Sequence, residues 1–236
     1  MIVGFATPKG GAGKSTSCLA LAGAAIERNS DIPVTLIDLD SQRAMERFCE
    51  KRAYNNLPAF NVSCKYMAEC SDYRSIHELA LSENEKGGLV LLDLPGHASD
   101  FNLLSAAIAD IVVIPSALNT DEIYLGMNYL YMLMDYAQNS EWRLSSSFLL
   151  NRIPSVQSAA SKSIRESLIE LEVSMFKTEF PYLQIASDIV GTGQFPFELA
   201  KRETSVKSSE KLRSLSMDFL SEVYDLYTNG TTWREK

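Results

Sequence analysis

The sequence predicts an α/β protein with a single doubly wound, mostly parallel sheet and helices on both faces. Two observations support this prediction: short continuous apolar runs, two of which end in aspartate, and intervening segments whose apolar residues recur at helical spacing. Strands and helices that alternate in this way build parallel sheets from βα units. The 236 residues are 46% hydrophobic, which is ample for one core, and we expect residues 1–236 to form one domain.

The first half of the chain alternates between the two patterns. Residues 33–38 and 88–93 are apolar runs stopped by an aspartate, as expected for strands buried on both faces. Residues 15–28 carry apolar side chains at i, i+3 and i+4, which is typical of a helix packed on a sheet. We expect strands at 2–6, 33–38, 60–67 and 88–93, and helices at 15–28, 42–54 and 73–86.

The second half continues the alternation and ends in a long helix. We expect helices at 101–109, 123–137, 156–171 and 206–227, strands at 111–115 and 148–151, and a weaker strand near 175–180. Residues 181–196 are expected to form a loop, because they contain Gly191 and Gly193 and show little periodicity. The last helix has two apolar stripes and an acidic outer side, so we expect it to pack against the domain.

A glycine-rich turn joins the first strand to the first helix. Residues 7–16 read Thr-Pro-Lys-Gly-Gly-Ala-Gly-Lys-Ser-Thr. Gly10, Gly11, Ala12 and Gly13 allow successive backbone amides to turn inward on an anion, and the helix N-terminus adds partial positive charge. In such a cradle Lys14 reaches the β- and γ-phosphates of a nucleotide, the Ser15 hydroxyl binds Mg²⁺, and Thr16 bonds an inner phosphate.

The motif departs from the general phosphate-loop pattern, because Pro8 stands where the first glycine is required. The octet Lys-Gly-Gly-Ala-Gly-Lys-Ser-Thr, with its additional Lys9, instead resembles the deviant Walker A motif of the ParA/MinD superfamily of P-loop ATPases. The resemblance implies a P-loop NTPase fold, ATP as substrate and Mg²⁺ as cofactor. It also implies an ATP-bound homodimer in which Lys9 reaches the phosphates held by the other subunit, much as an arginine finger does.

Three aspartates extend the expected site along the sheet edge. Asp93 ends an apolar strand as a Walker B aspartate does, and we expect it to hold Mg²⁺ through water together with Ser15. Asp38 is expected to bond the water shell of the metal. Asp40 resembles the residue with which the superfamily orients the attacking water, although helix capping shared with Ser41 is an alternative.

The resemblance also assigns roles to residues near the ends of two other strands. Asn151 matches the position from which the superfamily's asparagine bonds the adenine edge, and Arg152 is expected to pack beside it. His97 follows Pro95-Gly96, where the second switch of the superfamily lies, yet a surface or capping histidine is the simpler interpretation.

Other branches of the superfamily lack support in this sequence. An iron-protein reductase needs cluster cysteines after the second aspartate strand, but all four cysteines precede Asp93. A MinD-like membrane ATPase would end in a basic amphipathic helix, whereas the last helix here is acidic on its outer side. We expect no added client-binding region of the kind that an arsenite-pump ATPase carries. The phosphate loop begins near residue 8, so no preceding helix-turn-helix is expected.

A compact ParA-type ATPase remains, and it implies non-specific DNA binding by the ATP dimer. The net charge of −8 requires any DNA-binding surface to be concentrated. A candidate consists of Lys201, Arg202, Lys207, Lys211 and Arg213, for which a solvated mixed-charge helix face is the alternative.

We therefore expect a cytoplasmic ATPase, nucleoid-associated when bound to ATP and without stable membrane association, that segregates or positions plasmid or other mobile DNA. A centromere-binding or adaptor protein would stimulate its slow hydrolysis. A conjugation-linked DNA-positioning ATPase, a MinD-like positioning ATPase and a metabolic ATP-dependent enzyme are the alternatives.

Overall fold

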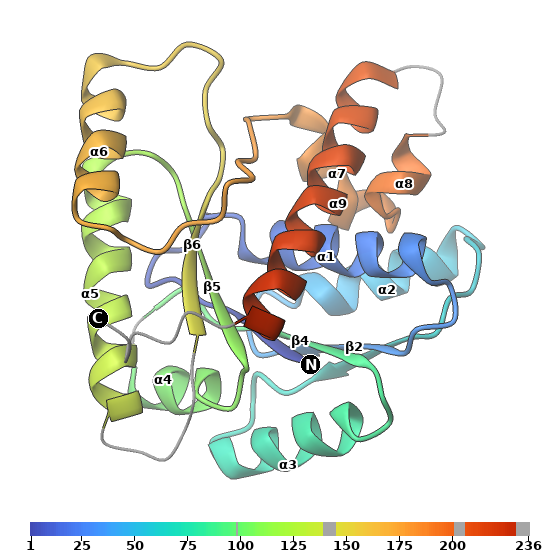
Figure 1. Cartoon of the computed structure of the whole chain (residues 1–236). Helices are drawn as coiled ribbons and strands as arrows, with labels where there is room; N and C mark the ends of the chain where they lie inside the picture. The colour runs from blue at the N-terminus through green and yellow to red at the C-terminus, as the bar shows by residue number, and fades with distance from the viewer. Residues whose placement is uncertain (98, 139–144, 201–205, 230–236) are drawn as a thin grey trace.

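The computed structural model describes residues 1–97, 99–138, 145–200 and 206–229, which form one parallel sheet flanked by helices (Figure 1). The strands are β1 (Ile2–Phe5), β2 (Val34–Asp38), β3 (Val62–Tyr66), β4 (Leu89–Asp93), β5 (Ile111–Ser116) and β6 (Ser145–Leu150). Their order in the sheet is β3-β2-β4-β1-β5-β6, and every adjacent pair is parallel. The predicted doubly wound α/β fold is confirmed.

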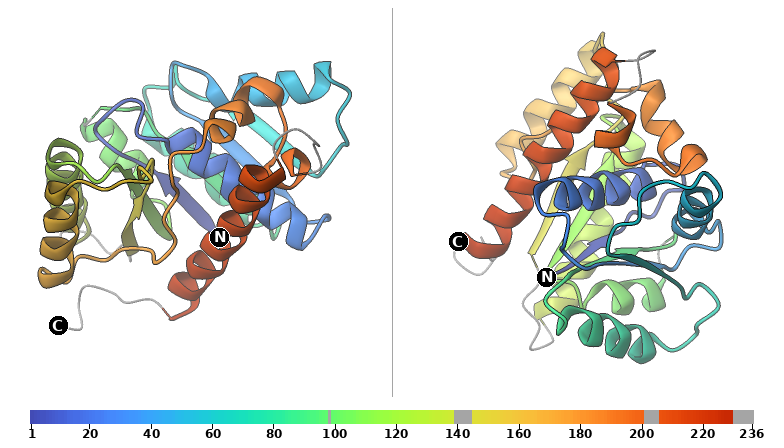
Figure 2. Two further views of the ribbon diagram at one scale, coloured as in Figure 1. Left: turned by 90° about the horizontal axis from the view of Figure 1, so that it is seen from above. Right: turned by 90° about the vertical axis from the view of Figure 1, so that its right-hand side faces the viewer.

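Helices cover both faces of this sheet. One face carries α1 (Lys14–Arg28), α2 (Ala44–Tyr54), α7 (Gln184–Thr192), α8 (Pro196–Leu199) and α9 (Val206–Asn229). The other carries α3 (Tyr73–Asn84), α4 (Asp100–Ala106), α5 (Thr120–Gln138) and α6 (Ala159–Glu170). Figure 2, right, shows α1 and α9 on one side of the strands and α3 and α4 on the other.

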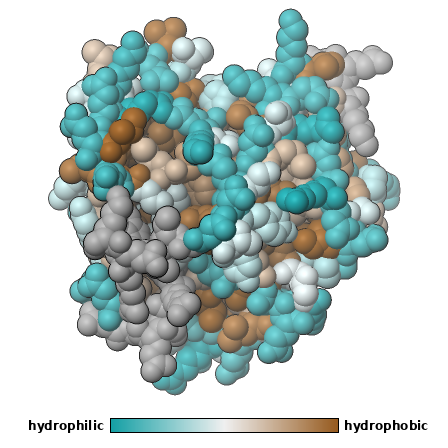
Figure 3. Space-filling model, viewed as in Figure 1, coloured by the Kyte–Doolittle hydropathy of each residue, from teal (hydrophilic) through white to brown (hydrophobic). Residues whose placement is uncertain are grey.

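Alternate residues of each strand supply the two halves of the core. In β4, Leu89 and Leu91 pack toward α1 and α9, whereas Val90 and Leu92 pack toward the opposite helices. All of these side chains are buried, which is why the strand sequences are continuously apolar rather than alternating. Hydrophilic side chains predominate on the face shown in Figure 3, with smaller hydrophobic patches between them.

The expectation of a loop over residues 181–196 was wrong, because residues 184–192 form α7 and α8 begins at Pro196. Ile185 and Ile189, one helical turn apart, are buried against α1 and α2 and stabilise a helix too short to give a strong sequence pattern. Gly193 ends α7 with a φ of 71°, so it marks a helix terminus rather than an extended loop.

The prediction of a weaker strand near residues 175–180 was also wrong. Only isolated parallel bridges form here, Phe148 with Met175 and, just after the segment, Ile153 with Pro181. The Glu222 side chain of α9 accepts bonds from the backbone N–H groups of Lys177 and Thr178, so two donors that a further strand would use are already occupied. Helix α9 otherwise packs on α1 through Leu212, Phe219, Leu220 and Val223, as the apolar stripes predict.

Within the described ranges, no helix combines the length and the apolar composition that crossing a membrane requires.

Candidate nucleotide-binding site

The site lies where the carboxyl ends of the central strands meet. Phe5 of β1 is level with Asp93 of β4, and Asp93 is in turn level with Asp38 of β2. The turn between β1 and α1 therefore begins beside two aspartates that are distant in sequence. Ligands of open α/β sheets bind at this edge, as expected from the motif spacing.

The phosphate loop has the backbone geometry that its glycines predict. Gly11 and Gly13 have φ angles of 75° and 94°, values that residues with a Cβ rarely adopt. A Cβ on Gly13 would also lie 2.2 Å from Nδ2 of Asn151. Helix α1 begins at Lys14 without a side-chain cap, so its first N–H groups are available to an anion.

Lys14, Ser15 and Asp93 form the centre of the site. The Ser15 hydroxyl donates to Oδ2 of Asp93 at 2.6 Å, and Lys14 is only 5% exposed. Burial raises the pKa of Asp93 to about 7, although the Ser15 hydrogen bond and the Lys14 charge act in the opposite direction. The other oxygen, Oδ1, is buried and has no hydrogen-bond partner among the described residues.

This arrangement fits a hydrated Mg²⁺ ion. A buried carboxylate oxygen without a partner is costly, and a cation or its water would satisfy it. Ser15 and Asp93 are both hard oxygen donors on adjacent elements, which matches the preference of Mg²⁺ for few protein ligands.

Asp38 has a structural role that the sequence did not indicate. Its Oδ2 accepts from the backbone N–H groups of Met45 and Glu46 at the start of α2, and its Oδ1 accepts from that of Asp40. Burial raises the pKa of Asp38 even though these hydrogen bonds lower it. Asp38 thus anchors the N-terminus of α2, and its expected contact with the water shell of the metal stays a prediction.

Asp40 is half-buried and lies in the turn before α2. Its Oδ1 accepts from the Gln42 N–H at 2.9 Å, which closes a local turn rather than capping the helix. Helix α2 begins at Ala44 after Arg43, whose φ is 54°. The capping function that we considered for Asp40 and Ser41 is therefore supplied by Asp38, and Asp40 stays a candidate for orienting water.

Lys9 forms an ion pair that the sequence analysis missed. Its Nζ lies 3.2 Å from Oε1 of Glu122 in the first turn of α5, while its side chain is 43% exposed. Arg152 binds both oxygens of the same carboxylate at 2.7 Å. Burial tends to raise the pKa of Glu122, but the Ala117 N–H, Arg152 and Asn119 outweigh it and lower the pKa to about 2.

Glu122 therefore connects the phosphate loop to the end of β6 through a single buried carboxylate. An acidic residue in the first turn of a helix is common, because it complements the helix dipole, so the sequence carried no signal for this role. Only the return of α5 to the phosphate loop identifies it.

Asn151 closes the site on the side of β6. Its Nδ2 donates to the Ala12 carbonyl at 3.3 Å and to the Ser17 hydroxyl at 3.2 Å, and its Oδ1 accepts from the N–H of Arg152. Asn151 thus contacts the phosphate loop, and its role at adenine stays a prediction. The guanidinium of Arg152 binds Glu122, and the exposed His97 contributes its backbone carbonyl to Asn102.

The predicted DNA-binding residues are only partly grouped. Lys207 and Lys211 are exposed on α9, but Arg213 pairs with Glu27 at 2.5 Å and with Glu210 at 3.2 Å. The charge of Arg213 is thus largely neutralised within the molecule. Lys201 and Arg202 lie outside the described residues.

Comparisons with known proteins agree with this geometry. A family model described as VirC1 protein matches residues 1–225. Protein ParA from Rhizobium radiobacter is 24% identical over 177 residues, which cover 75% of this chain and 76% of that protein. The resemblance to the ParA/MinD superfamily is confirmed.

Two solved structures share the fold. Apo McdA from Cyanothece has a TM-score of 0.70 at 14% identity, over 92% of this chain and 98% of that one. A plasmid partition protein from Borrelia burgdorferi, bound to AMPPNP, has a TM-score of 0.63 at 16% identity, over 94% and 98% of the two chains.

Proposed function

This chain belongs to the VirC1 protein family, and on that premise we propose that it is an ATPase that dimerises around ATP and positions DNA. The observation that carries the proposal is the position of Lys9, a second lysine at the phosphate loop that is held outside the phosphate cradle by Glu122. Lys14 already supplies the buried cation within the cradle, so Lys9 is available for phosphates bound elsewhere.

The residues of the site have separate roles in binding and hydrolysing ATP. The amides of residues 10–16 and the Lys14 ammonium bind the phosphates, and Ser15 and Asp93 hold Mg²⁺. When bound, Mg²⁺ neutralises charge on the β- and γ-phosphates. Asp40, half-buried in the turn before α2, orients the attacking water, while Asn151 and Arg152 contribute on the adenine side.

We propose that Lys9 changes partner during the cycle. In this structure it pairs with Glu122, which also binds Arg152, so that carboxylate keeps one cation when Lys9 leaves. In the ATP-bound homodimer Lys9 would bind the phosphates of the other subunit, where a triphosphate supplies more negative charge than one carboxylate. Dimerisation thereby depends on ATP.

Replacing Lys9 tests this proposal. Lys9→Ala should bind a fluorescent ATP analogue at near wild-type affinity but show no ATP-induced increase in mass by light scattering. Glu122→Gln, which weakens the present partner of Lys9, should still dimerise, and Lys162→Ala on the exposed side of α6 is the control for loss of one charge. ATP-induced dimerisation of Lys9→Ala equal to that of the wild type would refute the proposal.

The same dimer would place two copies of any basic surface on one particle. Non-specific DNA binding of about 10⁻⁴ to 10⁻⁶ M needs only a few phosphate contacts, so doubling a weak patch couples DNA binding to ATP. We propose that the cytoplasmic protein joins the nucleoid in this state, and that a DNA-bound partner stimulates hydrolysis and releases it. The match to Protein ParA supports plasmid partition as the use of this cycle.

The neighbouring reading frames distinguish the remaining uses. A small DNA-binding protein beside this gene would support partition, whereas a relaxase or a coupling protein would support positioning of transferred DNA. A metabolic ATP-dependent enzyme would have no use for Lys9, so retention of full turnover by Lys9→Ala would favour that class.

A further inference from the structure

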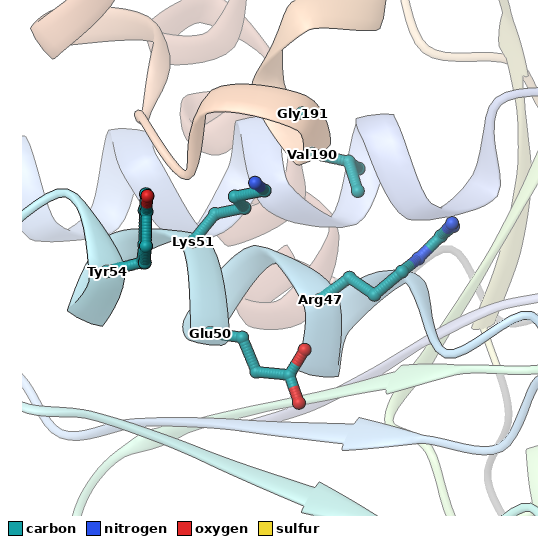
Figure 4. Close-up of a pocket in the computed structure, with 6 residues that line it drawn as sticks. All are labelled: Arg47, Glu50, Lys51, Tyr54, Val190 and Gly191. Carbon is teal, nitrogen blue, oxygen red and sulfur yellow. The ribbon is translucent and has the colours of Figure 1, made fainter.

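A groove runs between α2 and α7 on the face of the sheet that carries α1 (Figure 4). Its volume is about 490 Å³, and it is lined by Arg47, Glu50, Lys51, Tyr54, Val190 and Gly191. The residues assigned to ATP do not line it. We propose that this groove binds single-stranded DNA, with a base stacked on Tyr54 and phosphates on Arg47 and Lys51. The inference rests on the proposed function, because it assigns a DNA surface to the same protein.

The cations of the groove form a stripe along one face of α2. Arg47, Lys51 and Tyr54 follow one another at intervals of four and three residues, so they project on the same side of the helix, whereas Arg43 precedes the helix. Arg43 already pairs with Glu46 and lies over the Tyr66 ring.

Arg47 and Lys51 are the cations that remain for a ligand. Both are exposed, and neither forms an ion pair within the described part of the chain. In Figure 4 they extend on the side of α2 that faces α7, whereas Glu50 points the opposite way, toward the strands. The groove therefore presents two positive groups and one carboxylate, that of Glu50, whose side chain points away from α7.

Tyr54 supplies the aromatic surface. It is 80% exposed, and the Lys51 ammonium lies 5.3 Å from the centre of its ring. An exposed ring beside cations is the combination with which proteins bind unpaired bases and their phosphates. Bases in a duplex are stacked on each other, so a single strand is the form that can use this ring.

Close packing and hydrogen bonds join the two walls of the groove. Gly193, at the end of α7, lies so close to α2 that a Cβ would fall 2.5 Å from the N atom of Arg52. The Arg52 guanidinium donates to the Gly193 carbonyl at 2.8 Å, and Asn55 donates to that of Thr192 at 2.9 Å. Gly191 has no atom within 4 Å of where its Cβ would be, which leaves its backbone open to a ligand. A preformed site avoids the cost of ordering its walls on binding.

The test measures binding of a fluorescent oligo-dT strand to the full-length protein with ATP and Mg²⁺. Tyr54→Ala should weaken binding about 5-fold or more, whereas Tyr54→Phe, which keeps the ring, should bind as the wild type does. The double variant Arg47→Gln/Lys51→Gln should reduce the slope of log K against log salt by about 1.4, for two phosphate contacts on a single strand. An oligonucleotide carrying iodouracil should crosslink to Tyr54 on irradiation, as mapped by mass spectrometry.

Matched controls separate this site from general charge effects and from the ATP switch. Lys162→Gln/Lys177→Gln removes the same charge from exposed positions elsewhere and should leave binding unchanged. Wild-type protein that dimerises with ATP but does not bind oligo-dT would overturn the groove and leave the proposed function standing. Equal loss of duplex and single-strand binding in Tyr54→Ala would also overturn it. The proposal would likewise fail if an acidic peptide displaced the labelled strand but unlabelled oligo-dT did not.

Discussion

At the scale of single residues, Asp93 has the clearest unsatisfied polar group of the candidate site. One of its oxygens accepts from Ser15 and the other has no partner within the described chain, although the side chain is fully buried. An ionised carboxylate in that position is destabilising until a cation compensates it. The raised pKa of Asp93 expresses this cost.

Replacing Asp93 with Asn should change how stability depends on pH in the absence of nucleotide and Mg²⁺. The pKa of Asp93 rises from about 3.9 unfolded to about 7 folded. The folded state therefore binds more protons, and stability should fall as pH rises through this window. The Asp93→Asn protein should not show this decrease in the free energy of unfolding, which amounts to about 1.4 kcal/mol per unit of pKa difference. Urea unfolding between pH 4 and 7.5 measures it, and parallel profiles for the two proteins would contradict the assignment.

Asp40 accepts a hydrogen bond that closes a local turn, and we also propose that it orients water. Two variants separate these roles. Asp40→Ala should slow ATP hydrolysis about 100-fold or more and leave the ATP dimer intact. Asp40→Asn keeps the acceptor for the Gln42 N–H but not the carboxylate, so it should be equally slow. Phosphate release and light scattering report the two effects. Normal turnover in Asp40→Asn would show that Asp40 only shapes the turn.

At the scale of elements, the loop after β4 lies directly on the phosphate loop. A Cβ on Gly96 would fall 2.9 Å from the Cα of Gly10 and 3.2 Å from Nζ of Lys14. The two loops come from elements far apart in sequence and meet because β1 and β4 are neighbours in the sheet. The fit of these loops is thus a property of strand order.

Gly96→Ala should weaken ATP binding because backbone atoms of the phosphate loop cannot move aside as a flexible side chain would. We expect a loss of about 1–3 kcal/mol in stability, the usual cost of overpacking, and a matching loss of affinity for a fluorescent ATP analogue. Unfolding in urea and nucleotide titration measure the two quantities. Unchanged affinity would mean that the loops separate freely.

At the scale of the whole molecule, an acidic chain must concentrate its positive charge to bind DNA. The net charge is −8, and several exposed cations are neutralised by neighbours, Arg213 by Glu27 and Glu210 among them. Lys207 and Lys211 on α9, and Arg47 and Lys51 on α2, form no ion pairs among the described residues.

Charge reversal on α9 tests the duplex-binding surface. Lys207→Glu/Lys211→Glu should abolish retention of duplex DNA by the ATP-bound protein and leave basal hydrolysis intact. Each lost phosphate contact should reduce the slope of log K against log salt by about 0.9. Arg213→Gln should instead reduce stability with little effect on DNA, because its charge is used within the molecule. Filter binding over a salt series measures the retention of duplex DNA by each variant. Undiminished retention by the double variant would assign duplex binding to another surface.

The sequence predicted most of the fold because buried parallel strands and amphipathic helices have distinct local periodicities. The positions of Lys14, Ser15 and Asp93 followed for a related reason, since phosphate loops and strand ends are contiguous signals. Helix α7 was missed because its apolar pattern is short and its terminal Gly193 resembles a loop residue. Glu122 was missed because nothing in its local sequence refers to Lys9.

The sequence by itself thus determined the glycine-rich turn, most of the alternation of strands and helices, and the family to which they point. Each of these depends on residues that are neighbours in the chain or that repeat with a fixed period. Only the tertiary structure decided that Asp38 anchors α2, that Glu122 holds Lys9 and Arg152, that Arg213 is neutralised, and that Arg47, Lys51 and Tyr54 line a groove. These outcomes depend on burial and on contacts between distant segments, and local sequence patterns do not encode such contacts.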